Sequence, residues 1–99
     1  MLFAVRFHDV ADGLPIRQAH TDAHMEWIAK TGNAVVAAGP LRSGGPESTP
    51  IGALWVVRGD SIEQVRAMLD EDPFVKNGLR AKTEIYQWTK AWPATISEI

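Results

Sequence analysis

Apolar and polar positions along the chain follow two periods, one typical of strands and one typical of helices. Residues 1–7 are apolar on both faces of a strand except at Arg6, a pattern that favours a central strand. Short apolar runs at residues 34–38 and 51–57 predict a second and a third strand, and residues 80–90 alternate well enough to predict a fourth. We expect residues 34–38 to form a buried strand that ends at Gly39-Pro40, with the rest of the chain covering it.

The first predicted helix covers about residues 15–31. Proline is well placed in a first helical turn, and Gly32-Asn33 supplies a helix end. A wheel at 3.6 residues per turn puts Ile16, Ala23 and Trp27 at the centre of its apolar stripe. The same wheel puts His24 at the edge of the stripe, near water.

The second predicted helix follows a capping box. Asp60-Ser61 precedes Glu63 and Gln64, and apolar residues then recur at helical spacing. This helix must end by Asp72, because a residue before proline is pushed out of the helical region. One further turn is expected over residues 73–77, closed by Gly78.

The order of these elements is βαββαβ, which predicts an α+β, ferredoxin-like fold with an antiparallel sheet. Both helices should cover one face of the sheet. The other face is also apolar along the first and third strands, and a small domain cannot leave such a face wet. We therefore expect a two-fold homodimer, packed sheet to sheet, of a single domain over residues 1–99.

Composition narrows the function classes. The 99 residues carry a net charge of −2 with no stripe of Lys and Arg, so nucleic acid is not an expected partner. The chain has no cysteine, which excludes a disulfide framework, a thiolate nucleophile and a Cys-ligated metal. No apolar run is long enough for a membrane span and no signal-peptide pattern is present, so a cytoplasmic protein is expected.

Four stretches of the chain, in order, resemble the YciI-like (YCII-related domain) family. They are residues 9–17 (DVADGLPIR) with His24 seven positions on, residues 38–41 (AGPL), residues 69–79 (LDEDPFVKNGL) and residues 84–88 (EIYQW). The resemblance covers nearly the whole chain. It implies a dimeric α+β barrel, with a homodimer or a higher oligomer, that needs no metal or organic cofactor.

The resemblance also implies an active pair. The family's histidine on the first helix matches His24, and the aspartate of its Asp-Pro-Phe/Tyr motif matches Asp72. Two positions depart from the family pattern. Thr21 or Asp22 stands where many members have a second arginine, and Gly52-Ala53 stands where many have Gly-Ser.

The pair is chemically reasonable on its own. A carboxylate that accepts a hydrogen bond from one imidazole nitrogen fixes the tautomer and makes the other nitrogen a better base. Asp72 would orient His24, which would act as general base or acid on an unidentified small molecule. Arg17 is the candidate to hold an anionic oxygen, and Gly39, Pro40 and Phe74 are further candidates for substrate binding.

Each candidate also has a purely structural explanation. His24 would then be a hydrogen-bonded helix histidine, and Asp72 would only cap the turn over residues 73–77. Arg17 would be solvated, and Gly39-Pro40 would only mark a strand end. The i, i+4 pair of His20 and His24 resembles half of a zinc site, with His8 or Asp22 as the candidate third ligand, but the glutamate of HExxH is missing. We expect no metal.

Two function hypotheses follow. The first is a small cofactor-independent lyase or isomerase that moves protons with His24 and Asp72. The second is a non-catalytic metabolite-binding or accessory domain with the same pocket. Both predict a pocket, so only the titration and turnover of the pair would separate them.

Overall fold

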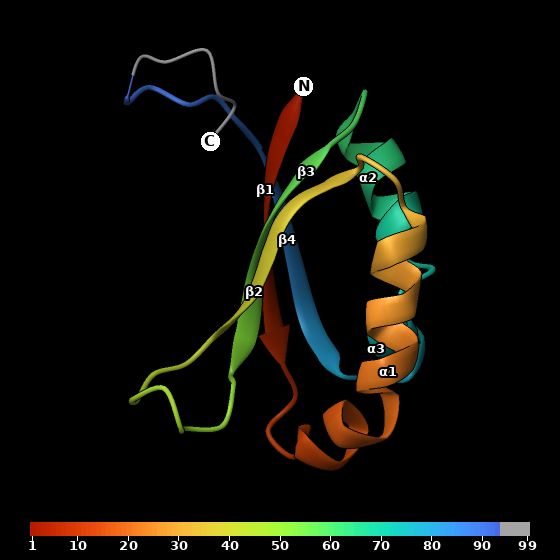
Figure 1. Ribbon diagram of the computed structural model, residues 1–99, viewed down its shortest axis with the longest axis vertical. Helices are drawn as coiled ribbons and strands as arrows, with labels where there is room; N and C mark the ends of the chain where they lie inside the picture. The colour runs from red at the N-terminus through yellow and green to blue at the C-terminus, as the bar shows by residue number, and fades with distance from the viewer. Residues whose placement is uncertain (94–99) are drawn as a thin grey trace.

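An antiparallel sheet of four strands carries all the helices on one face (Figure 1). The computed structural model describes residues 1–93. Its elements are β1 (Leu2–Asp9), α1 (Leu14–Lys30), β2 (Val35–Leu41), β3 (Gly52–Arg58), α2 (Ile62–Leu69), α3 (Pro73–Lys76) and β4 (Arg80–Trp88). The strand order β2-β3-β1-β4 is the ferredoxin-like arrangement. The predicted α+β fold class is confirmed.

The first strand is central, as its two apolar faces predict. β1 pairs with β3 on one side and with β4 on the other, both antiparallel. Alternate residues of β1 are buried under the helices, and β3 contributes a matching row. The buried apolar side chains of this core are Phe3, Val5, Phe7, Ala53, Trp55, Val57, Val65, Leu69 and Ile85.

The second strand differs from its prediction. β2 is an edge strand that pairs only with β3 within the described part of the chain, and Ala37 and Ala38 are exposed. Gly39 and Pro40 lie inside β2 and do not end it. The prediction of a buried strand covered by the rest of the chain is wrong. Small apolar residues suit an edge strand beside a pocket as well as a core strand, so the apolar run could not separate the two.

The face that α1 buries also differs from its prediction. Ala23, placed at the centre of the stripe, is exposed, whereas His24 is the one residue of α1 classed as buried. The buried face is therefore rotated towards the histidine, and His24 is not at a wet edge. Its hydrogen bond to Asp72 satisfies the ring's polarity, and hydropathy alone cannot anticipate that.

Local signals at the helix ends are confirmed. The Ser61 hydroxyl accepts a hydrogen bond from the Gln64 backbone N–H, and the Gln64 side chain accepts one from the backbone N–H of Asp60. Gly32 and Gly78 both have positive φ, at 69° and 79°, which is the left-handed conformation that glycine supplies at a helix end. Asp72 caps α3 by accepting from the Phe74 N–H at 3.0 Å.

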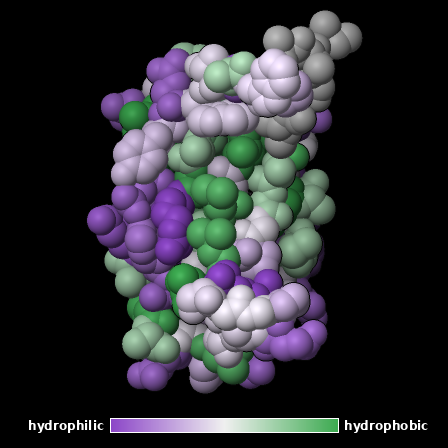
Figure 2. Space-filling view, turned by 90° about the vertical axis from the view of Figure 1, so that its left-hand side faces the viewer, coloured by the Kyte–Doolittle hydropathy of each residue, from purple (hydrophilic) through white to green (hydrophobic). Residues whose placement is uncertain are grey.

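The face of the sheet away from the helices is open. Figure 2 shows this face with a continuous hydrophobic band beside a strongly hydrophilic patch. The register places Val56, Ala4 and Tyr86 side by side across β3, β1 and β4, and the next row contains Leu54, Arg6 and Glu84. Leu54 is 50% exposed and Tyr86 is 56% exposed. This open face is the surface that the sequence predicts to be covered by a second copy.

Two further points concern the ends of the chain and the membrane. The sequence also predicts a tail over residues 91–99, of which 94–99 lie outside the described residues. Within residues 1–93, no helix has the length and apolar character needed to cross a membrane.

Candidate active site

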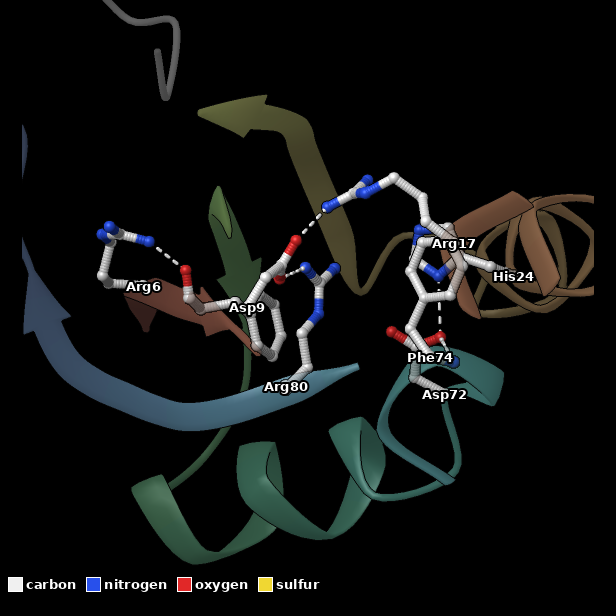
Figure 3. A network of polar contacts seen from close by, with 8 residues as sticks. Arg6, Asp9, Arg17, His24, Asp72, Phe74 and Arg80 are labelled. Carbon is white, nitrogen blue, oxygen red and sulfur yellow. Dashed lines mark hydrogen bonds and ion pairs between the residues drawn. The ribbon is translucent and has the colours of Figure 1, made fainter. Parts of the chain in front are cut away.

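A buried carboxylate joins α1 to α3. The Asp72 side chain is completely buried, and its Oδ1 atom accepts two hydrogen bonds. One comes from the Phe74 backbone N–H at 3.0 Å, and the other involves His24 Nδ1 at 2.7 Å. Asp72 is therefore a helix cap and a histidine partner at the same time, and the predicted meeting of the two side chains is present (Figure 3).

The imidazole of His24 is held in place by aromatic rings. It stacks on Phe74 with centroids 3.9 Å apart and planes inclined by 16°. It also lies against Trp55 of β3, with centroids 5.6 Å apart. Because an ionised carboxylate only accepts hydrogen bonds, Nδ1 must carry a proton when it bonds Asp72. In the neutral ring this leaves Nε2 with its lone pair free to accept a proton.

A second polar group lies next to this pair. Asp9, at the end of β1, accepts from Arg17 Nη2 at 2.6 Å through Oδ2 and from Arg80 Nη1 at 2.7 Å through Oδ1. The Arg80 guanidinium lies over the Phe7 ring at 4.4 Å and near the Phe74 ring at 5.2 Å. Burial lowers the pKa of Arg80, and the hydrogen bond that Arg80 donates to Asp9 opposes that shift.

One pocket with a volume of about 580 Å³ is lined by Arg17, His24, Trp55, Phe74 and Arg80, and it is large enough for a small molecule. Its walls come from α1, β2, β3 and the start of α3. Most of the wall is apolar, and its polar groups converge from α1 and β4. The polar and aromatic members are Arg17, Thr21, His24, Arg42, Trp55, Phe74 and Arg80.

The structure brings together every residue predicted for the site. His24 and Asp72 share a hydrogen bond, and Arg17, Gly39, Pro40 and Phe74 all line the pocket. Arg17 is not merely solvated, because it pairs with Asp9 and its Cζ lies 5.4 Å from the centroid of the Phe74 ring. Of the residues named as departures from the family pattern, Thr21 and Ala53 line the same pocket, whereas Asp22 and Gly52 do not.

Sequence reasoning missed Asp9 and Arg80. The composition of residues 9–13 marks Asp9 only as a turn residue, and the alternation over residues 80–90 marks Arg80 only as the start of a strand. They meet because β1 and β4 pair in a register that places these two residues opposite each other. The signal that could have found Asp9 was its place at the end of an apolar strand, with Arg17 eight positions further on.

The arrangement can orient an imidazole, accept or donate a proton at Nε2, and place positive charge beside the pocket. In the described residues, no three side chains of His, Cys, Asp or Glu are grouped closely enough to hold a metal ion. In particular, the suggested half zinc site is not completed there by a third ligand, and His24 uses Nδ1 for Asp72.

Comparison with known proteins gives a family match. The model of the YCII-related domain family matches residues 1–89. No curated protein is similar enough to match the chain in sequence.

Among the solved structures that resemble this chain, one is similar in sequence and in fold, and two others illustrate similarity of fold alone. The chain is 25% identical to 5-chloro-2-hydroxyhydroquinone dehydrochlorinase (TftG) from Burkholderia phenoliruptrix AC1100, solved in complex with 2,5-dihydroxybenzoquinone. That match has a TM-score of 0.81 and covers 90% of this chain and 94% of the other. The protein Atu4242 from Agrobacterium tumefaciens is 9% identical, with a TM-score of 0.55 over 95% and 98% of the two chains. A NIPSNAP domain protein from Burkholderia xenovorans is 17% identical, with a TM-score of 0.51 over 96% and 100%.

Proposed function

The chain belongs to the YCII-related domain family, and from this premise we propose that it is a small-molecule enzyme of the lyase or isomerase kind. His24 transfers the proton and Asp72 orients it, without a metal or an organic cofactor. The observation that carries the proposal is the hydrogen bond of 2.7 Å between a buried carboxylate and a histidine that lines a pocket. A structure similar to this chain also belongs to a dehydrochlorinase.

Asp72 has two effects on the base. Its hydrogen bond keeps the proton on Nδ1, so that Nε2 is the nitrogen that accepts a proton from the substrate. Its negative charge then stabilises the imidazolium that forms, because a carboxylate in a buried site interacts strongly with a nearby cation. Phe74 and Trp55 keep the ring in one plane while this happens.

The pocket suits a small planar molecule with acidic hydroxyl groups. Its wall is mostly apolar, and Arg17 and Arg80 bring positive charge to it. TftG is named for the loss of HCl from a chlorinated hydroxyhydroquinone. In a reaction of this class, a base takes a hydroxyl proton while the carbon that carries chlorine gains a proton. Loss of a second hydroxyl proton then expels chloride, which leaves with the electron pair of the C–Cl bond. Proton and chloride balance as HCl, so no oxidant is required.

A second copy of the chain is proposed to cover the open face of the sheet. This hydrophobic band lies on the side of the sheet opposite the helices (Figures 1 and 2). Packing the same face of two copies together creates a two-fold interface, the commonest oligomeric symmetry. The site itself is formed on the helix side of one chain.

Ring-proton exchange tests the proposal without assuming the leaving group. 2-Hydroxyhydroquinone is incubated anaerobically with the protein in D₂O, and the loss of ring C–H signals is followed by ¹H NMR. Release of chloride from 5-chloro-2-hydroxyhydroquinone is measured in parallel. We expect the wild type to accelerate at least one process and His24→Gln to reduce it by about 10²-fold or more, as for the loss of a general base.

His20→Gln is the matched control, since His20 lies one turn before His24 on the same helix and lines no part of the pocket. It should leave the rate unchanged. Binding of both compounds with no exchange and no chloride release would contradict catalysis and support the metabolite-binding alternative. Equal loss of activity in His20→Gln and His24→Gln would contradict the role given to His24.

A further inference from the structure

Two buried polar atoms near the site have no hydrogen-bond partner among residues 1–93. One is Asp72 Oδ2, an acceptor, because both hydrogen bonds of this carboxylate are made by Oδ1. The other is Arg80 Nε, a donor, because the Arg80–Asp9 bond is made by Nη1. The side chains of Asp72 and Arg80 are 0% and 2% exposed. Leaving a buried charged group unsatisfied is expensive, so each of these atoms requires a partner.

The side chains of Asp72 and Arg80 both lie next to Phe74. Asp72 caps the N–H of Phe74, and the Arg80 Cζ lies 5.2 Å from the centroid of the Phe74 ring. The chain also links them, because Leu79 N–H donates to the Phe74 carbonyl at 3.0 Å and Arg80 follows directly. In Figure 3 the second oxygen of Asp72 points to the side on which Arg80 lies. The negative charge of Asp72 acts favourably on Arg80.

We propose that Arg80 is a positioning residue for the His24–Asp72 pair, its Nε–H reaching Asp72 Oδ2 through one buried water molecule. The water accepts from Nε–H and donates to Oδ2, so both atoms are satisfied. The bridge thereby holds the Asp72 carboxylate with its Oδ1 turned to His24. Arg80 does not touch the reacting atoms: it lends positive charge to the pocket, and it acts on the base through Asp72.

This bridge joins the two polar groups of the site. Asp9 holds Arg80 through one oxygen and Arg17 through the other, so the line runs from Arg17 through Asp9, Arg80 and Asp72 to His24. An anionic substrate group bound by Arg17 would then change the electrostatic potential at His24 through these charged side chains. The inference rests on the proposed function only for its kinetic test.

The first test is spectroscopic and needs no substrate. The ¹H–¹⁵N signal of Arg80 Nε–H is followed in the wild type, in Asp72→Asn and in Glu71→Gln. We expect a signal protected from exchange with solvent that shifts in Asp72→Asn. Glu71→Gln, a matched exposed acid next to Asp72 that pairs with Lys76, should leave it in place. A signal that exchanges rapidly with solvent, or one that does not shift in Asp72→Asn, would overturn the proposal.

The second test is a double-mutant cycle on the exchange or chloride-release rate. Arg80→Lys keeps the charge but loses the Nε donor, and it should lower kcat about tenfold with KM little changed, the equivalent of one hydrogen bond to a charged group. In an Asp72→Asn background it should have no further effect, because Arg80 acts through Asp72. Full additivity of the two substitutions would refute the linkage. Arg66→Lys, an exposed arginine of α2, is the control.

Further measurements distinguish a variant that fails to fold from one that loses its function. Circular dichroism and thermal unfolding check that Arg80→Lys is folded. If it is not, Asp9→Asn keeps Arg80 and loosens its anchor, and the same signal shift and rate loss are expected. If wild type shows no turnover but its Arg80 Nε–H responds to Asp72→Asn, the bridge stands and the proposed function fails. If turnover depends on His24 but Arg80→Lys leaves kcat unchanged, the proposed function is supported and the water bridge is refuted.

Discussion

The open face of the sheet gives a prediction with a defined magnitude. Leu54 lies on this face and is 50% exposed in the single chain. Leu54→Ala removes three carbon atoms, each contributing about 0.8 kcal/mol when fully buried. Half of the side chain is already covered within the chain, so the substitution removes roughly 1 kcal/mol of burial per copy. A two-fold dimer contains the residue twice, and the total is about 2 kcal/mol, or roughly a 30-fold weaker dimer.

Sedimentation equilibrium measures this directly. We expect the wild type to dimerise. Leu54→Ala should raise the dissociation constant of the dimer roughly 30-fold, with an unchanged circular dichroism spectrum. Ile62→Ala is the matched control. Ile62 begins α2 on the helix side of the sheet and is 40% exposed, so a similar apolar area is removed from a surface outside the proposed interface.

Two results would refute this account of the open face. A wild-type chain that stays monomeric at high concentration would mean that no second copy covers the face. An equal change in Leu54→Ala and Ile62→Ala would mean that the copies do not meet through the sheet. Either result would leave the geometry of the pocket in each chain unaltered.

Three further predictions concern stability and the pocket. Hydrogen bonds from Tyr86 and then from His8 lower the pKa of Glu84 from 4.5 to about 2. The stability that this shift contributes is fully present above pH 4.5 and is lost as the pH falls towards 2. Across that window, the free energy of unfolding measured in urea should therefore fall less in Glu84→Gln than in the wild type. A Cβ added at Gly52 would collide with the carbonyl of Phe7 and the guanidinium of Arg6, whereas one at Gly39 meets nothing within 4 Å. Gly52→Ala should therefore lower the free energy of unfolding by about 1–3 kcal/mol, and Gly39→Ala should not, in the same urea assay. Phe74→Leu removes the ring stacked on His24 and should reduce kcat/KM up to roughly tenfold, the equivalent of one aromatic pair; an unchanged value would show that the stacking does not position the base.

Much of the fold follows from local signals in the sequence. The two apolar faces of the first strand placed it at the centre of the sheet, and the Asp-Pro sequence at Asp72 placed a cap at α3. Such signals act within a few residues, so one sequence is enough to read them. The βαββαβ order then leaves few antiparallel arrangements, and the ferredoxin-like one is found.

Features that depend on tertiary contacts were predicted less well. The run at residues 34–38 was expected in the core, but β2 lies at the sheet edge, because pairing partners are not encoded in hydropathy. The buried face of α1 was centred on Ala23, whereas the structure buries His24. A histidine can only be buried at this depth because Asp72, 48 positions away, satisfies it. The sequence alone ranks an alanine above a histidine for such a position.

The residues of the site also divide into those with a local sequence signal and those that depend on tertiary contacts. His24 and Asp72 were found because a family resemblance named them and the chemistry of a carboxylate–imidazole pair supported them. Asp9 and Arg80 carry no local signature, since each lies at an ordinary strand end. Their meeting depends on the register between β1 and β4, which no motif specifies.

The tautomer of His24 tests the central claim most directly. ¹⁵N NMR of the neutral ring distinguishes a protonated nitrogen from one with a free lone pair. We expect Nδ1 to carry the proton and Nε2 to carry the lone pair in the wild type, and the proportion of this tautomer to fall in Asp72→Asn. A wild-type ring protonated on Nε2, or a tautomer indifferent to Asp72→Asn, would contradict the role of Asp72 and with it the proposed base.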